Sequence, residues 1–185
     1  MVLPDEVKTL LASPHASPYR GDVIRWMMWR GKPIDPTPEN MEAAIIFLLT
    51  NFAEFRTITD YRINLSGLFE SRIKVYNHLP RTVELYIGCR NVGPGLIVSH
   101  GHGTIVHAES IGNDFFVNQN VTIGYDGKSG IPVIGDRVTI HTGAVVVGKI
   151  TIGSDVTIGA NAVVHFDVPS KSKVFAPRAT IVTSE

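Results

Sequence analysis

The feature that most constrains this chain is an apolar position that recurs every six residues between Ile87 and Val168. A helix repeats every 3.6 residues and a strand every two, so neither element alone produces this spacing. Short strands joined by tight turns do produce it when three strands make up one coil. The recurring positions, with one step of eleven in place of six, are Ile87, Gly93, Ser99, Ile105, Ile111, Val117, Ile123, Ile134, Ile140, Val146, Ile152, Ile158 and Val164. The sequence therefore predicts an all-β, hexapeptide-repeat β-helix.

Turn residues between the apolar positions support the same fold. Gly143, Asn161 and the pair Gly135-Asp136 fall where corners are expected, and Gly, Asn and Asp tolerate the positive φ of tight corners. One hexapeptide cannot bury its own apolar face, so the coils must stack. At eighteen residues to a coil, the segment is long enough for about four to five coils.

Composition narrows the function classes. Lys plus Arg and Asp plus Glu both total 17, so net charge gives no reason to expect a nucleic-acid partner. The single Cys89 cannot form an intrachain disulfide and fits a reducing compartment. The apolar run 43–49 is too short to span a bilayer, and Asp5 and Glu6 stand where a signal peptide would carry positive charge. We therefore expect a soluble cytoplasmic protein.

Residues 1–80 lack the period of six and have helical signals instead. The expected helices are Pro4–Leu11, a helix over 23–30 capped by Asp22 and ended by Gly31, a helix starting at Thr37-Pro38, and one or two helices over Phe55–Leu79. We interpret Trp26, Met27 and Trp29 as core or subunit contacts rather than a ligand slot. The chain thus divides into a helical domain, residues 1–80, and a β-helix domain, residues 81–185. The helical domain would cover the exposed strand edges at one end of the β-helix.

The step of eleven between Ile123 and Ile134 predicts a loop. Five residues within 125–132 must leave the coil for the repeat to stay in phase. Loops that interrupt a rigid scaffold often carry function, and a tolerated surface insertion is the alternative. Past Val168 the repeat stops, and residues 175–182 are expected to form a final strand that plugs the end of the β-helix.

Three histidines, His100, His102 and His107, fall within one short Gly-rich stretch. Counting eighteen residues to a coil, plus five for the loop, places Asn118, His141 and Gly159 in one column with His100. Such a column would line a groove of roughly 15 Å along the β-helix axis. The groove would suit a long, thin ligand whose reactive end lies at His100.

A neutral imidazole near pH 7 can accept the proton of an attacking hydroxyl group. Such a base needs a carboxylate or carbonyl partner that fixes its tautomer. Glu84 and Glu109 are the nearby acids, and spacing does not decide between them.

A metal site is the rival interpretation, because His102 and His107 are five residues apart and zinc sites use several histidines. The β-helical γ-class carbonic anhydrases combine such a spacing with a third histidine about two coils upstream. The corresponding position here is Ser66, outside the repeat. We therefore expect no metal.

From about Glu84 to Val182 the chain resembles the serine acetyltransferase group of hexapeptide acyltransferases, which includes related bacterial polysaccharide and sugar O-acetyltransferases. The segments that carry the resemblance are Gly95–Gly101, Val121–Gly124, Gly127–Gly130, Ile134–Asp136, Thr142–Ala144, Val147–Gly148, Ile152–Gly153 and Ile158–Val164. Phe55-Arg56 and Tyr61–Ile63 also resemble the helix that precedes the repeat in that group.

The resemblance implies a left-handed parallel β-helix that forms a homotrimer, with pairing of two trimers left open. It implies acetyl-CoA as acetyl donor, bound between neighbouring subunits. His100 would be the general base and Glu84 the carboxylate that orients it. The expected cofactor contacts are Gly124, Thr142, Gly143, Ala160, Lys173 and Arg178. Acceptor binding is assigned to Ser99, His102 and Asn118.

Two departures from the group bear on the acceptor. Ser99 stands where serine acetyltransferases have Asp, and residues 130–133, Gly-Ile-Pro-Val, lack the Arg and His of their Gly-Asp-Arg-His-Pro run. Those groups hold the charges of serine, and charges left unpaired are costly to bury. We therefore predict acetyl transfer to a hydroxyl of a sugar or polysaccharide precursor. Serine is the alternative acceptor, and a non-catalytic β-helical scaffold is the second alternative.

Overall fold

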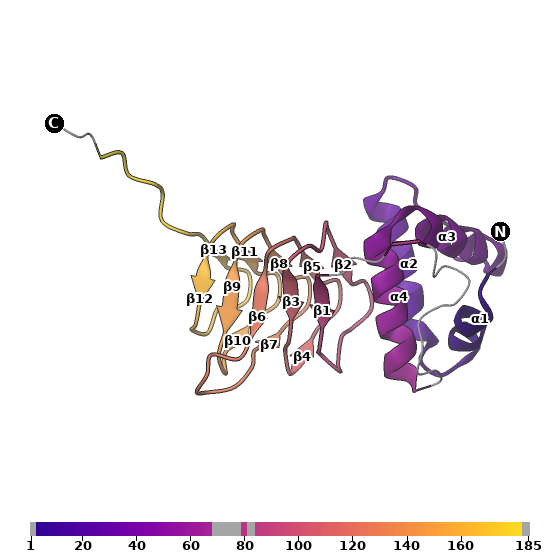
Figure 1. Cartoon of the computed structure of the whole chain (residues 1–185), viewed down its shortest axis with the longest axis horizontal. Coiled ribbons are helices and arrows are strands. Elements are labelled where there is room, and N and C mark those ends of the chain that lie inside the picture. Colours follow the sequence, from indigo (N-terminus) through magenta and orange to yellow (C-terminus); the bar gives the residue numbers. More distant parts are fainter. Residues whose placement is uncertain (1–2, 68–78, 81–83, 183–185) are drawn as a thin grey trace.

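The computed structural model describes residues 3–67, 79–80 and 84–182 of the chain. Its N-terminal part is helical and its C-terminal part is a stack of short parallel strands, with the helices covering one end of the stack (Figure 1). The two five-stranded sheets of the stack correspond to a solenoid of about five turns, as the hexapeptide count predicts. Every helix within the described ranges is too short or too polar to cross a bilayer.

The helical region contains α1 (Asp5–Ala12), α2 (Ala16–Trp29), α3 (Pro38–Asn51) and α4 (Ala53–Ser66). Thr37 caps α3 as expected, since its Oγ1 accepts a hydrogen bond from the Asn40 amide at 3.3 Å. Gly31 follows α2 with a φ of 69°. The expected helices over Phe55–Leu79 are confirmed in part by α4, and residues 68–78 lie outside the described residues. The predicted domain boundary at residue 80 stays a prediction, because residues 81–83 next to it also lie outside the described residues.

The prediction for Asp22 is wrong. Helix α2 begins at Ala16, so Asp22 lies inside the helix and is fully buried. Its carboxylate is used by Arg62 of α4 and by the Leu96 amide instead of capping α2.

Within the described residues, thirteen short strands build the β-helix. They are β1 (Leu85–Ile87), β2 (Ile97–Val98), β3 (Thr104–Val106), β4 (Ser110–Ile111), β5 (Phe116–Val117), β6 (Thr122–Gly124), β7 (Val133–Ile134), β8 (Thr139–Ile140), β9 (Val145–Val147), β10 (Thr151–Ile152), β11 (Thr157–Ile158), β12 (Val163–Val164) and β13 (Lys173–Val174). They form three parallel sheets, ordered β1-β3-β6-β9-β12, β4-β7-β10 and β2-β5-β8-β11-β13. Inside the β-helix, the inward-pointing residues of successive coils stack in register. For example, Val117 stacks on Ile140 and Ile140 on Ile158, and all three are fully buried.

The register of the first coil differs from the prediction by one residue. Val98 pairs with Val117, and Val106 pairs with Ile123, so the inward positions there are Val98 and Val106 rather than Ser99 and Ile105. Ile105 is 43% exposed, whereas Val106 is 1% exposed. The reason is two irregular steps. A five-residue step from Ile87 to Val92 brings Val98 inward, and an eight-residue step follows from Val98 to Val106, where the other corners without loops use six or fewer. The corner that carries His100 is therefore expanded.

A buried ion pair joins helices α2 and α4, and both of its members also bond to the first coil. Arg62 Nε and Nη2 donate to the two carboxylate oxygens of Asp22 at 2.7 and 3.0 Å. The same guanidinium donates to the carbonyls of Val92 and Gly93, both at 2.7 Å, and Asp22 accepts from the Leu96 amide at 2.8 Å. Burial raises the pKa of Asp22, while the Arg62 charge and these hydrogen bonds favour the carboxylate. Helices α2 and α4 are thus tied to residues 92–96 by directional bonds.

The predicted plug at the C-terminal end is wrong. Strand β13 extends the sheet beyond β11, but residues 175–182 form no strand and run away from the body (Figure 1). Phe175, Ile181 and Val182 are exposed. Phe175 still lies beside Gly159 and Ala176 packs on the core, but the chain beyond them leaves the stack.

Replacing Asp22 tests the junction. Asp22→Asn leaves the buried Arg62 guanidinium without its counter-charge, so we expect the free energy of unfolding to fall by about 3–5 kcal/mol. Urea denaturation followed by circular dichroism measures the change. Asp155→Asn, which removes the exposed partner of Arg137, is the matched control and should have a much smaller effect. Equal effects of the two substitutions would contradict the role given to Asp22.

Candidate active site

His100 lies in the expanded corner that follows β2. The corner has an unusual backbone, because His100, Gly101 and Gly103 have φ values of 66°, 38° and 62°. Non-glycine residues with positive φ also occur at other corners of the β-helix, such as Asp114 and Asn161, but at the His100 corner three residues within four adopt it. The His102 amide donates to the His100 carbonyl, and Thr104 Oγ1 lies 3.3 Å from the His102 carbonyl and 3.2 Å from the Asn118 carbonyl. These contacts fix the shape of the corner.

The predicted column beneath His100 is shifted by one residue. Because Val98 stacks on Val117, Ser99 lies above Asn118, His141 and Gly159. His100 instead occupies the next position, two residues after β2. The residues two positions after β5, β8 and β11 are Gln119, Thr142 and Ala160. Of the acceptor-binding candidates, Ser99 is buried, Asn118 is half-buried and His102 is exposed.

The candidate cofactor residues fall on more than one corner. Thr142, Gly143 and Ala160 follow β8 and β11 and share the His100 corner. Gly143 needs its φ of 71°, and a side chain there would collide with Asn161 Oδ1 of the next coil. Gly124 ends β6 and lies on a different corner.

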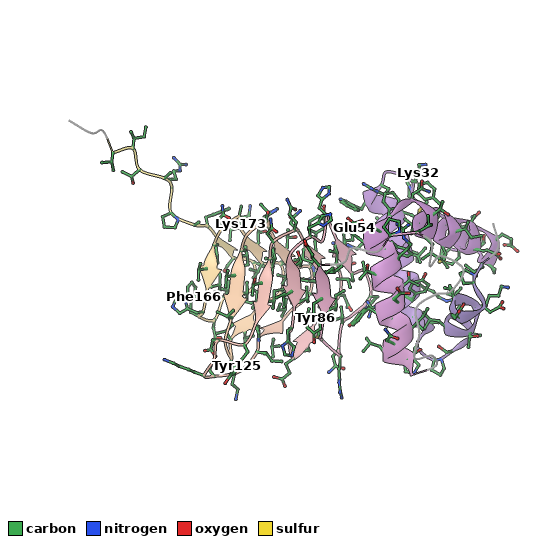
Figure 2. The ribbon with its side chains drawn as sticks, viewed as in Figure 1. Lys32, Glu54, Tyr86, Tyr125, Phe166 and Lys173 are labelled. Atoms are coloured by element: carbon green, nitrogen blue, oxygen red, sulfur yellow. The ribbon has the colours of Figure 1, made fainter. Side chains whose placement is uncertain are left out.

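Lys173 and Arg178 are both exposed. Lys173 is on β13, and Arg178 lies in the extended segment after it. Figure 2 shows Lys173 and Tyr125, which follows Gly124, on opposite sides of the β-helix.

Neither candidate carboxylate is bonded to His100. Glu84 is exposed just before β1, and its backbone carbonyl, not its carboxylate, accepts from the Thr104 amide at 3.1 Å. Glu109 is exposed ahead of β4. Among the described residues, no hydrogen bond or ion pair joins either carboxylate to His100. The described residues also hold no group of three or more His, Cys, Asp or Glu placed to bind a metal ion.

The His100 corner forms one wall of a small cavity of about 100 Å³. The other walls come from the helical cap and from β2, and the lining residues are Trp26, Trp29, Arg30, Phe52, Glu54, Val98 and His100. Trp26 and Met27 are buried as expected, but Trp29 faces this cavity. Sequence analysis missed Arg30 and Glu54, because only the docking of α2 and α4 on the corner brings them to His100.

A third residue missed by sequence analysis is Gln119, one coil below His100. Its Oε1 is a buried oxygen without a hydrogen-bond partner in the part of the chain that the structure describes. Buried polar atoms usually have a partner, so this oxygen is an acceptor available to a ligand or to a neighbouring subunit.

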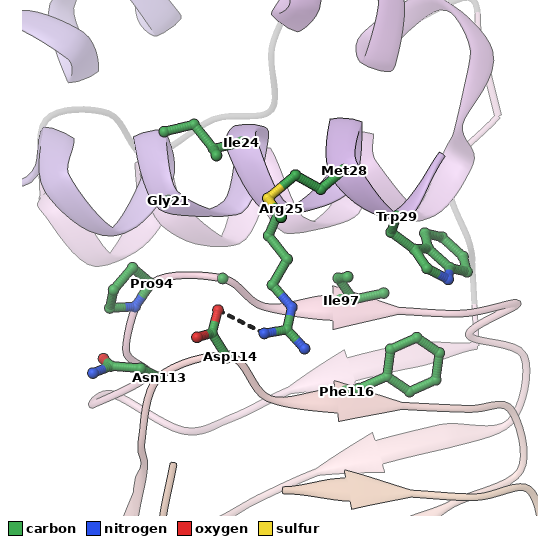
Figure 3. Close-up of a pocket in the computed structure, with 11 residues that line it drawn as sticks. Gly21, Ile24, Arg25, Met28, Trp29, Pro94, Ile97, Asn113, Asp114 and Phe116 are labelled. Atoms are coloured by element: carbon green, nitrogen blue, oxygen red, sulfur yellow. Dashed lines mark ion pairs between the residues drawn. The ribbon is translucent and has the colours of Figure 1, made fainter. Parts of the chain in front are cut away.

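A larger groove of about 700 Å³ lies beside the cavity, between α2 and strands β2 and β5 (Figure 3). Trp29 lines both spaces. The Nη1 atom of Arg25 and Oδ1 of Asp114 form an ion pair of 2.6 Å inside the groove (Figure 3). The remaining lining is largely apolar and includes Met28 and Phe116 but no histidine.

The loop 125–132 is held by its own aspartate. Asp126 Oδ1 accepts from the amides of Lys128 and Ser129 at 2.9 and 2.7 Å, and Oδ2 accepts from Ser129 Oγ at 2.6 Å. These hydrogen bonds hold the pKa of Asp126 well below its usual range. Ser129 Oγ also accepts from the Lys149 amide at 2.9 Å, which ties the loop to the next coil. Residues 125–132, between β6 and β7, therefore have a defined shape.

Comparison with known proteins identifies relatives of the repeat region. Residues 131–165 match the family described as bacterial transferase hexapeptide (six repeats). The serine acetyltransferase of Helicobacter pylori is 37% identical over 72 residues, which are 37% of this chain and 42% of that protein. This chain therefore matches less than half of that relative.

Solved structures resemble nearly the whole chain. The serine acetyltransferase isoform 3 of Entamoeba histolytica, in complex with cysteine, has a TM-score of 0.69 and 26% identity, covering 97% of this chain and 64% of that chain. The serine acetyltransferase of Neisseria gonorrhoeae, in complex with serine, has a TM-score of 0.65 and 26% identity, covering 91% of this chain and 70% of that chain. The repeat region is thus similar to bacterial hexapeptide transferases, and the fold of nearly the whole chain is similar to that of serine acetyltransferases.

Proposed function

We propose that this chain transfers the acetyl group of acetyl-CoA to a hydroxyl group, with His100 as general base. The observation that carries the proposal is the placement of His100 on an expanded corner that opens into a small cavity. A structural histidine would need neither the expanded corner nor the cavity. The serine acetyltransferase relatives support the same chemistry.

The proposed reaction needs one proton acceptor and one oxyanion donor. The His100 imidazole removes the hydroxyl proton as the oxygen attacks the thioester carbonyl carbon. A backbone N–H stabilises the oxyanion of the tetrahedral intermediate. The carbon–sulfur bond then breaks, CoA leaves as the thiol with the proton from His100, and the acceptor keeps the acetyl ester. Glu84 stays the proposed orienting carboxylate, since its backbone is bonded to Thr104 at the end of the His100 corner.

Serine is the acceptor that the comparisons favour, over the sugar hydroxyl predicted from sequence. All of the relatives and structures described above are serine acetyltransferases, and one was solved in complex with serine. A sugar hydroxyl is the second candidate, because residues 130–133 lack the charged run of serine acetyltransferases and Gly130-Ile131-Pro132-Val133 offers no charged side chain.

For acetyl-CoA, we propose that the thioester lies along the corner of His100, Thr142, Gly143 and Ala160. Lys173 and Arg178 are exposed cations suited to the phosphates of CoA. Gly124 lies on another corner and would join such a site from a neighbouring subunit. The proposed cofactor site therefore depends on assembly.

A homotrimer, with pairing of trimers left open, is supported by an apolar ladder on the outside of the β1-β3-β6-β9-β12 sheet. Its rungs stack in register and are Tyr86, Ile105, Thr122, Val145 and Val163. Tyr86 and Val163 are 57% and 61% exposed within one chain. Four of the five rungs are apolar, and a row of exposed apolar side chains is typical of a subunit interface.

Replacing His100 tests the chemistry. His100→Ala should lower kcat by about 10²–10⁴-fold, the range for a general base, and should leave CoA affinity unchanged. Thiol release from acetyl-CoA and CoA titration calorimetry measure the two effects. His15→Ala, an exposed histidine of the helical region, is the control. Full activity of His100→Ala would support the scaffold alternative.

An acceptor screen separates the two candidates. Incubation with acetyl-CoA and either L-serine or nucleotide- and lipid-linked sugars should give O-acetylserine as the main product. Mass spectrometry detects the added acetyl group in each case. Transfer to sugars with none to serine would establish the second candidate instead.

The ladder makes a prediction about assembly. Ile105→Lys places a charge in the apolar ladder, so the mass in light scattering should fall from trimer to monomer. Thr151→Lys changes an exposed residue of the β4-β7-β10 sheet and should leave the trimer intact. A monomeric wild-type protein at the same concentration would refute the assembly proposal.

A further inference from the structure

The cavity beside His100 has a rigid apolar floor. Trp26 and Val98 are almost fully buried, and Trp26 Nε1 donates to the Leu96 carbonyl at 2.9 Å. The Trp26 ring meets Trp29 edge-on, with centroids 5.3 Å apart, and tilts against Phe52 at 5.8 Å. Side chains locked in this way hold the rim of the cavity in place.

Two opposite charges lie on that rim. Arg30 Cζ sits over the Phe52 ring at 4.0 Å and over the Trp29 ring at 4.8 Å. A guanidinium placed over rings keeps N–H groups at its edge for a carboxylate. Glu54 is half-buried in the first turn of α4 (Figure 2). Neither Arg30 nor Glu54 forms an ion pair with any described residue.

We propose that Arg30 and Glu54 are the acceptor-recognition residues, which bind the carboxylate and the amine of a small hydroxy amino acid. The inference rests on the proposed acetyl transfer and specifies its acceptor class. The cavity presents one cation, one anion and one imidazole, and a zwitterion with a hydroxyl group can satisfy all three. Charge-assisted hydrogen bonds of this kind are the strong ones in ligand recognition.

Size and charge favour an amino acid over a sugar. At about 100 Å³, the cavity is well below the 300–1,000 Å³ of pockets for drug-sized ligands. A neutral sugar could stack on Trp29 but would leave both charges of the rim unpaired as it displaced water. The charged run missing from residues 130–133 is thus compensated from the helical cap.

Steady-state kinetics with L-serine and acetyl-CoA test the assignment. Arg30→Gln and Glu54→Gln should each raise KM for serine about tenfold or more, and should change kcat and KM for acetyl-CoA little. The reason is that a charge-assisted bond made equally in the serine complex and in the transition state affects serine binding and not the chemical step. Lys32→Gln and Glu42→Gln remove nearby exposed charges outside the cavity and serve as matched controls.

Truncated acceptors give a pattern that a merely structural role would not. Ethanolamine lacks the carboxylate, so Arg30→Gln should lower the preference for serine over ethanolamine about tenfold and Glu54→Gln should not. 3-Hydroxypropanoate lacks the amine, so Glu54→Gln should lower the preference for serine over 3-hydroxypropanoate about tenfold, and Arg30→Gln should not. Both tryptophans of the chain line the cavity, so their fluorescence should report serine binding without acetyl-CoA, weakened in both variants.

The outcomes separate this inference from the proposed function. Serine acetylation with KM unchanged in both variants would overturn the inference and leave the acetyl transfer intact. Acetyl transfer only to sugars, abolished by His100→Ala, would also overturn the inference and leave the acetyl transfer intact. Activity on no acceptor, with no effect of His100→Ala on CoA turnover, would overturn both.

Discussion

The buried Asp22–Arg62 pair is the contact on which the geometry of the site depends. Apolar packing alone would hold the helical cap on the first coil without fixing its rotation, because hydrophobic burial has no direction. Arg62 supplies four directional bonds, to Asp22 and to the carbonyls of Val92 and Gly93. Those bonds fix α2 and α4 relative to the coil that leads into His100. Arg30, at the end of α2, and Glu54, at the start of α4, take their positions from them.

The expanded corner supplies the other half of the site. The five-residue step from Ile87 to Val92 brings Val98 onto the stack, so His100 lies above Gln119 rather than Asn118. Two extra residues between Val98 and Val106 then widen the corner, and Gly101 and Gly103 accept the left-handed backbone that the turn needs.

The period of six was sufficient to predict the β-helix, the loop at 125–132 and the helix start at Thr37, because each has a local signal. The register of the first coil could not be predicted. The eight-residue step from Val98 to Val106 is offset by five-residue steps from Ile87 to Val92 and from Val106 to Ile111, so the apparent column returns to phase and hides the shifts at Ser99 and Ile105. The cavity could not be predicted from the sequence either, since Glu54 and His100 line the same cavity only when the helical cap docks on the first coil.

The source of the charges in the cavity changes how the short loop should be interpreted. Loss of charged residues after Gly130 argues against an amino-acid acceptor only if no other element supplies them. Arg30 and Glu54 lie at helix ends held by the buried pair, and sites built on such elements are more precise than sites on loops. Asp126 meanwhile uses its carboxylate to hold the loop itself. Acceptor recognition and loop structure are therefore assigned to different parts of the chain, and a shorter loop does not by itself imply a neutral acceptor.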